Sequence, residues 1–166
     1  MIVGLSVGAF TTLHVIISLI GIASGLLVLL AMLAGREPPG LAGLFLCTTI
    51  LTSATGFLFH SAKIGPPHVV GAISLVVLAL ALIGLYLKHL NGPWRAIYVI
   101  SAVLSLYFNA FVGVVQAFGK IGFLKALAPT GSEPPFAIAQ GLVLLLFAAL
   151  GFLAVRKFHP AVAASA

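Results

Sequence analysis

The chain has very little charge. Only 6% of its 166 residues are charged, and two of these, Glu37 and Glu133, are its only acids. Roughly a quarter of the residues are charged in a soluble domain, so this composition does not supply a water-soluble surface. With two acids in all, a carboxylate pair for acid–base catalysis and an oxygen-ligated site for a hard cation inside the apolar part of the chain are also excluded.

Cysteine and the common catalytic motifs are scarce as well. Cys47 is the only cysteine, which excludes an internal disulfide, and its apolar neighbours suggest a small core residue. The sequence has no H-x-x-x-H, H-E-x-x-H or C-x-x-C motif, no glycine-rich phosphate loop and no serine nucleophile motif. Hydrolysis and phosphoryl transfer are therefore not expected. Electron transfer, ligand binding and a structural role remain, and whether the chain is an enzyme stays open.

What the chain has in abundance is apolar sequence, 62% of all residues, in long uninterrupted stretches. About 20 apolar residues cross about 30 Å of hydrocarbon, and a spanning segment must be a helix because its backbone polar groups need partners inside lipid. We predict an all-α integral membrane protein, a single domain over 1–166. Its five transmembrane helices are expected at about 9–34, 41–61, 67–89, 94–118 and 134–158.

Short loops separate these stretches, and proline stands at or just before the start of four of the five, as the first turn of a helix tolerates it. The connection over 119–133 mixes apolar and basic residues. It predicts a short amphipathic helix in the membrane interface, or alternatively an ordered cap over that end of the bundle.

Basic residues fall unequally on the two sides of the predicted bundle. One side carries Arg36, Lys88, Arg95, Arg156 and Lys157, and the other carries Lys63, Lys120 and Lys125. The more basic side is expected to be cytoplasmic, which puts the N-terminus outside and the C-terminus inside a bacterial inner membrane. Since these residues sit at helix ends, the net charge of +6 indicates anchoring in a lipid bilayer rather than nucleic-acid binding.

Each predicted helix brings one histidine or glutamine to the same depth near the outer side. In chain order these are His14, His60, His68, Gln116 and Gln140. Ionisable residues inside a membrane mark functional sites by default. Asn109 lies nearer mid-membrane, where an unpaired amide costs several kcal/mol, so it needs a helix, a water or a ligand as partner.

Three kinds of cofactor suit such a site. His14, His60 and His68 are candidate ligands for copper or zinc. His14 and His68 are alternatively the axial pair of a haem b, with Gly21 and Gly25 making room for the macrocycle. A quinone head group held by histidine, asparagine or glutamine is the third, and in each case Asn109, Gln116 and Gln140 would supply further hydrogen bonds.

A plainer interpretation stands beside these. His60 and His68 flank a loop and suit solvated interface residues, whereas Asn109 suits a polar contact between helices. The stripes of serine, threonine and glycine along the helices are typical of tight helix packing, with hydroxyls bonded to their own helix.

Four segments carry a resemblance to known proteins. Leu13–Gly21, Thr52–Phe57, His68–Val77 and Ser132–Phe136 resemble a group of small bacterial inner-membrane proteins, a resemblance that implies the fold and brings no activity with it. The layout of histidines near helix ends is also similar to haem-b membrane proteins of the cytochrome b561 type. That similarity implies His14 and His68 as a haem pair.

The sequence therefore predicts a membrane redox or ligand-binding module with an outer His/Asn/Gln site. The alternative is an accessory subunit without a cofactor, packed against other membrane subunits or a second copy of itself. A small transport pathway is a third reading, weakened because the sequence shows neither inverted repeats nor broken mid-membrane helices.

Overall fold

A computed structural model of the chain describes residues 1–59 and 66–160, with the backbone alone at 66 and 67. These residues form helices, with no strand among them: α1 (Val7–Leu33), α2 (Pro39–Gly56), α3 (Pro66–Leu82), η1 (Ile83–Leu87), α4 (Trp94–Lys120), α5 (Gly122–Leu127) and α6 (Pro134–Lys157). Counting α3 and η1 together, five helices are long and apolar enough to cross a membrane. The prediction of an all-α bundle with five such helices is confirmed.

The helices begin where the sequence offers a start signal. Ser6 caps α1, since its hydroxyl accepts a hydrogen bond from the Ala9 amide at 3.2 Å. Pro39 and Pro134 open α2 and α6 at positions where the missing amide hydrogen is not needed. After α1 the chain turns through Gly35, whose φ of +71° is a conformation that residues with a side chain rarely adopt.

The end of α2 differs most from the predicted one. α2 ends at Gly56 rather than near 61, because the amides of Phe57 and Leu58 close tight turns on Ala54 and Thr55 at 3.2 and 3.1 Å. The third spanning helix finishes in the wider π-helical turn η1. There the Lys88 amide donates to the Ile83 carbonyl at 2.8 Å, five residues back.

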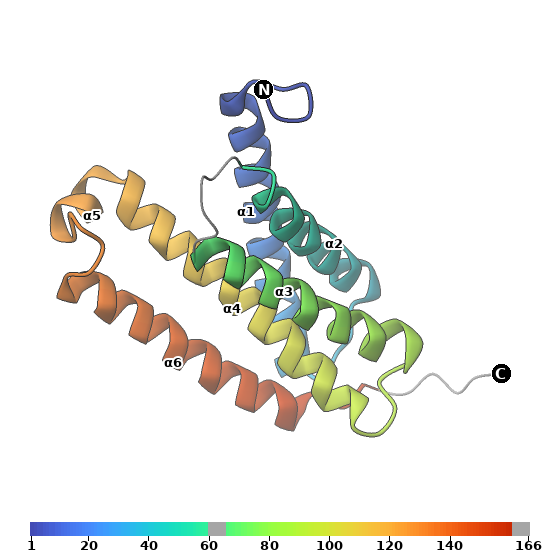
Figure 1. The fold of residues 1–166 in the computed structure, drawn as a ribbon. Coiled ribbons are helices and arrows are strands. Elements are labelled where there is room, and N and C mark those ends of the chain that lie inside the picture. Colours follow the sequence, from blue (N-terminus) through green and yellow to red (C-terminus); the bar gives the residue numbers. More distant parts are fainter. Residues whose placement is uncertain (60–65, 161–166) are drawn as a thin grey trace.

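α4 is the central helix of the bundle. It packs against α1, α2, α3, α5 and α6, and α3, α4 and α6 run beside one another in Figure 1 while α1 and α2 pack as a pair. In the most apolar window of α4, 39% of residues are buried, against 11% in α6. α6 is thus a peripheral helix that presents most of its surface to lipid.

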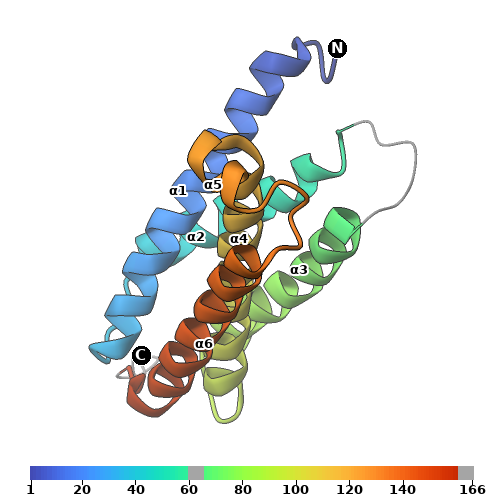
Figure 2. The ribbon, with the colours of Figure 1, turned by 90° about the vertical axis from the view of Figure 1, so that its left-hand side faces the viewer.

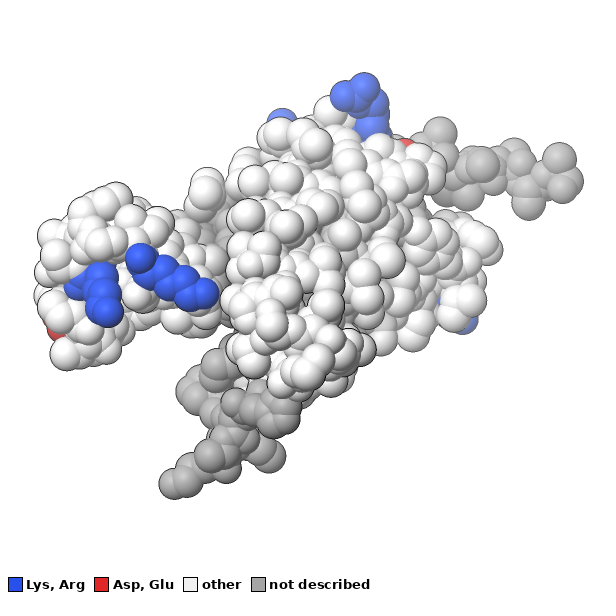
Figure 3. Space-filling model, turned by 90° about the horizontal axis from the view of Figure 1, so that it is seen from above, with Lys and Arg blue, Asp and Glu red and all other residues white. Residues whose placement is uncertain are grey.

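The two ends of the bundle carry the polar loops. Figure 2 shows the start of α1 and α5 at one end, here called the N-terminal end, and the last turns of α1 and α6 at the other, called the C-terminal end. On the face seen in Figure 3, basic side chains gather towards the extremities and a broad belt between them is uncharged. This is the distribution that a membrane-spanning bundle requires.

Hydroxyl groups inside the bundle bond to their own helices. Ser24 donates to the Ile20 carbonyl at 2.6 Å, and Ser105 donates to that of Ser101 at 2.8 Å. Both serines are buried. Such groups let helices approach closely without needing a ligand, so the packing interpretation describes this part of the polar stripes.

α5 is the short helix expected between the last two spanning helices. It packs against α4 and leaves Phe123 and Leu127 exposed by 69% and 53%. Lys125 lies on the same short helix. Exposed apolar side chains beside a lysine suit the membrane interface, where the hydrocarbon and the water are both within reach.

Candidate functional site

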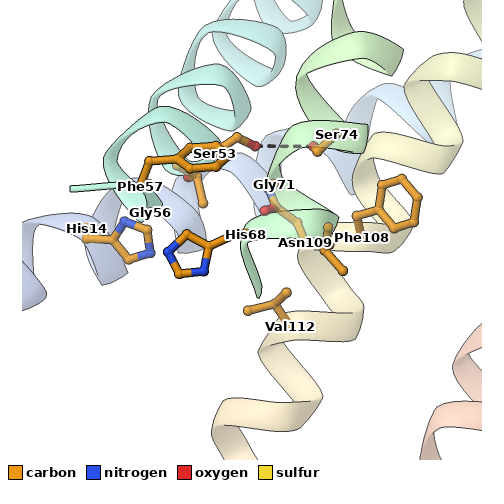
Figure 4. Close-up of a pocket in the computed structure, with 12 residues that line it drawn as sticks. His14, Ser53, Gly56, Phe57, His68, Gly71, Ser74, Phe108, Asn109 and Val112 are labelled. Atoms are coloured by element: carbon orange, nitrogen blue, oxygen red, sulfur yellow. Dashed lines mark hydrogen bonds between the residues drawn. The ribbon is translucent and has the colours of Figure 1, made fainter. Parts of the chain in front are cut away.

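A cavity of about 110 Å³ lies between α1, α2, α3 and α4, towards the N-terminal end. Its polar lining consists of His14, Thr52, Ser53, His68, Ser74 and Asn109, and its apolar lining includes Phe57, Val70, Phe108 and Val112. Figure 4 shows these side chains converging from four helices, with the rings of His14 and His68 pointing toward one another. The cavity thus combines two imidazoles and an amide with aromatic and aliphatic walls.

His14 is held from two sides. Its Nδ1 lies 2.8 Å from the Thr55 hydroxyl on α2, and its ring meets Phe59 edge-on with 5.2 Å between the ring centres. The side chain is half-buried. Because one ring nitrogen is occupied by Thr55, the other is the nitrogen that the cavity can use.

His68 enters the cavity from the first turns of α3. Its ring centre lies 5.9 Å from that of Phe57, at the end of α2. One turn later, Gly71 leaves room for the Phe57 ring, since a β-carbon at position 71 would come within 3.2 Å of that ring. The small residue at 71 therefore fixes the aromatic wall beside His68.

Asn109 has a hydrogen-bond partner on another helix, as expected for an amide at this depth, but the hydrogen bond is long. Its Nδ2 donates to the Thr49 hydroxyl on α2 at 3.4 Å, near the upper limit for a hydrogen bond. A β-carbon at Gly21 would lie 3.3 Å from this Nδ2 and equally far from the Thr49 hydroxyl. Gly21 thus lets α1 approach the amide, and the weak bond leaves Asn109 with capacity for a group in the cavity.

Two of the remaining predicted site residues, Gln116 and Gln140, are not brought to this cavity. Gln140 donates through Nε2 to the Phe111 carbonyl at 3.1 Å and so joins α6 to α4. Its Oε1 is buried without a hydrogen-bond partner among the described residues. Gln116 is exposed, and His60 lies outside the described residues.

Sequence reasoning missed Thr55 and Ser53, two of the neighbours that complete the site. Thr55 was not singled out, although it orients His14. Ser53 and Ser74 join α2 to α3 through a 3.2 Å hydrogen bond (Figure 4). The signal was the density of hydroxyls over 52–55, which is unusual for a lipid-facing turn.

The described residues do not form a metal site of the usual kind. No group of three or more histidine, cysteine, aspartate or glutamate side chains gathers among them. Zinc sites in proteins use three or four such ligands. His14 and His68 supply two, and the third predicted ligand, His60, is not among the residues described.

Haem b does not fit the cavity in this arrangement. A cavity of about 110 Å³ is below the roughly 300–1,000 Å³ of pockets that enclose drug-sized ligands, and a porphyrin needs at least that much. The glycines expected to make room for a macrocycle make room for neighbouring helices instead. A β-carbon at Gly25 would lie 2.7 Å from both Phe45 and Leu106.

The two acids lie outside the spanning helices, at opposite ends of the bundle. Glu133 precedes α6 and accepts hydrogen bonds from the Thr130 hydroxyl and amide at 2.8 and 3.0 Å, and from the Ser132 amide at 3.1 Å. Desolvation raises the pKa of the Glu133 carboxyl, but these hydrogen bonds outweigh it and hold that pKa at about 2. Burial raises the pKa of Glu37, between α1 and α2.

Because the chain has two glutamates, selective ¹³C labelling of the glutamate side chain should give two carboxyl resonances. One should titrate with a midpoint near pH 2 and the other above the ordinary glutamate value of about 4.3. Glu133→Gln assigns the first resonance by removing it. The low pKa also means that Glu133 stabilises the fold above about pH 4.3 and loses this contribution as the pH falls towards about 2. Two resonances titrating together near pH 4.3 would contradict both environments.

What the cavity can bind is inferred from its own geometry and chemistry. No protein-family model matches the chain, and no curated protein or solved structure matches it either.

Proposed function

We propose that this chain is a multi-pass membrane protein that binds the head group of a lipid-soluble, quinone-type ligand in the cavity between α1 and α4. The observation that carries this proposal is the convergence of His14, His68 and Asn109, from three helices, on one cavity with aromatic walls. Polar groups at membrane depth that face a shared cavity are the usual mark of a ligand site.

The size of the cavity favours a single ring. An apolar cavity of about 150 Å³ holds benzene, so a partly open cavity of about 110 Å³ would take at most one six-membered ring, with its substituents and tail outside. Phe57 and Phe108 line the cavity, and their rings would contact such a ligand. A quinone ring meets these limits, and a macrocycle does not.

The polar groups suit a ring with oxygens on opposite edges. Figure 4 places His14 at one side of the cavity and Asn109 at the other, with His68 between them. An imidazole and an amide can each bond a ring oxygen. This spacing on separate helices would orient a para-substituted ring across the cavity.

The proposal extends to the membrane side. Arg36, Lys88, Arg95, Arg156 and Lys157 belong to the C-terminal end, while Lys120 and Lys125 belong to the N-terminal end. By the bias of basic residues towards the cytoplasm, the cavity would lie in the outer half of a bacterial inner membrane.

Thermal unfolding of the purified protein in mild detergent tests the proposal. Tetramethyl-1,4-benzoquinone, supplied as a mixture of its oxidised and reduced forms, should stabilise the fold by about 2.7 kcal/mol at one hundred times its Kd. Asn109→Leu should abolish this stabilisation. Gln116→Leu is the matched control, because it removes an exposed amide from the same helix outside the cavity and should leave the stabilisation intact.

Other results would replace the proposal. A Soret band, or stoichiometric copper or zinc that is lost in His14→Ala, would assign a haem or a metal in place of the quinone. Absence of any ligand effect, together with co-purifying membrane subunits, would favour the accessory role.

A further inference from the structure

The hydroxyl of Thr55 decides which nitrogen of His14 carries the proton. This hydroxyl lies 2.6 Å from the Leu51 carbonyl and 2.8 Å from Nδ1 of His14. A hydroxyl has one hydrogen to donate and two lone pairs to accept with, whereas a carbonyl oxygen can only accept. The Thr55 hydrogen therefore goes to Leu51, and the Thr55 oxygen accepts a hydrogen from Nδ1.

The opposite assignment leaves a close contact without a hydrogen. If Nδ1 were bare, Thr55 would have to donate to His14, and its oxygen would face the Leu51 carbonyl at 2.6 Å with no hydrogen between them. With Nδ1 protonated, both contacts are hydrogen bonds. Nε2 of the neutral ring is then an unprotonated acceptor, on the side that faces the cavity and His68 in Figure 4.

Two other hydroxyl groups that line the cavity also donate their hydrogens to partners within the protein. Thr52 donates to the Thr48 carbonyl at 2.9 Å, and Ser53 donates to the Ser74 hydroxyl at 3.2 Å. Their oxygens remain as acceptors. Together with Nε2 of His14, the cavity offers several acceptors to one ligand.

A neutral ligand suits these acceptors better than a cation. Neither of the two acids of the chain lines the cavity to balance such a charge. The acceptors are therefore matched by neutral O–H donors.

We propose that the cavity selects the reduced, dihydroxy form of a quinone-type ligand, whose hydroxyl donates to Nε2 of His14, and that Thr55 is the positioning residue that keeps this nitrogen unprotonated. The inference rests on the proposed function, because it presumes that a quinone-type ring occupies the cavity. It adds which redox form is bound and which residue sets that preference.

Separate affinities for the two redox forms test the inference. Tetramethylhydroquinone, kept reduced without oxygen, should bind the wild-type protein in detergent about tenfold more tightly than tetramethyl-1,4-benzoquinone, as one net hydrogen bond allows. Thr55→Val should bring the two affinities within about threefold of one another. Thr55→Ser, which keeps the hydroxyl, should restore the preference.

The controls separate positioning from folding. Thr12→Val removes a hydroxyl that donates to the Gly8 carbonyl of its own helix at 3.1 Å and does not line the cavity, so it should leave the ratio of affinities unchanged. Equal affinities in the wild type, or an undiminished preference in Thr55→Val, would overturn the inference and leave the proposed function standing. Failure of both forms to bind would overturn the proposed function itself.

Discussion

Gly25→Leu should destabilise the bundle by about 3 kcal/mol, and Gly25→Ala by about 1 kcal/mol, as is typical when side chains are forced into a packed interior. Gly25 is buried on α1 where α2 and α4 come closest to it. A β-carbon there would lie 2.7 Å from Phe45 on α2 and 2.7 Å from Leu106 on α4. Both side chains are about 1% exposed, so neither has free space to move into, and the helices would have to separate.

Unfolding in mixed detergent measures this cost, and Gly141 supplies the matched control. Gly141 also lies within a spanning helix, α6, but a β-carbon there would meet nothing within 4 Å. Gly141→Leu and Gly141→Ala should therefore change the free energy of unfolding by less than about 1 kcal/mol. Equal effects at positions 25 and 141 would show that the close packing of α1, α2 and α4 is not what Gly25 provides.

The lengths and depths of the helices could be predicted because both are local properties of the sequence. Apolar runs bounded by proline and glycine define where a helix can cross, and counting along them places His14 and His68 at one depth. The structure places these two side chains on one cavity. Asn109, which needed a partner at its depth, lies on the same cavity and reaches Thr49.

The rotation of each helix about its axis is a property of packing, and here the sequence was less informative. Along one face of α4, Ser101 and Ser105 are buried, and Asn109 and Val112 further along line the cavity. This face loses its partners further on, so that Gln116 is exposed. α6 is apolar around most of its circumference, which leaves no pattern to show that Gln140 would bond the backbone of α4 instead of facing the cavity.

Partners within one or two turns of a helix end were the hardest to anticipate. Thr55 lies in the last turn of α2, where it meets His14 of α1. An α2 continuing to about 61 would have given no reason to single out this threonine.

Arg95→Ala should weaken the attachment of α6 and cost about 2–3 kcal/mol of unfolding free energy, the range for hydrogen bonds to a charged group. Nη1 of Arg95 donates its two hydrogens to the carbonyls of Val155 and Phe158, each at 2.7 Å. These carbonyls belong to the last turn of α6 and to its C-cap residue, where the helix supplies no donors of its own and the dipole favours a cation. α6 packs mainly on α4 and α1 and buries few of its residues, so we expect this charged clamp to contribute to its attachment.

Hydrogen exchange separates this clamp from a general effect of charge. In Arg95→Ala the amides over 150–158 should exchange faster, while those of α2 keep their protection. Arg156→Ala is the matched control, because it removes an exposed arginine from the same end of the bundle and keeps the clamp. Arg95→Lys should recover only part of the stability, since an ammonium lacks the planar geometry of the guanidinium.

Arg95→Ala also tests whether the docking of α6 affects the cavity. The cavity takes its lining from α1, α2, α3 and α4 and none from α6. Arg95→Ala should therefore loosen α6 at the C-terminal end while the affinity for a quinone-type ligand stays within about twofold of wild type, because additivity holds for distant sites without shared partners. Loss of binding in Arg95→Ala would show instead that the docking of α6 sets the position of α4, and with it of Asn109.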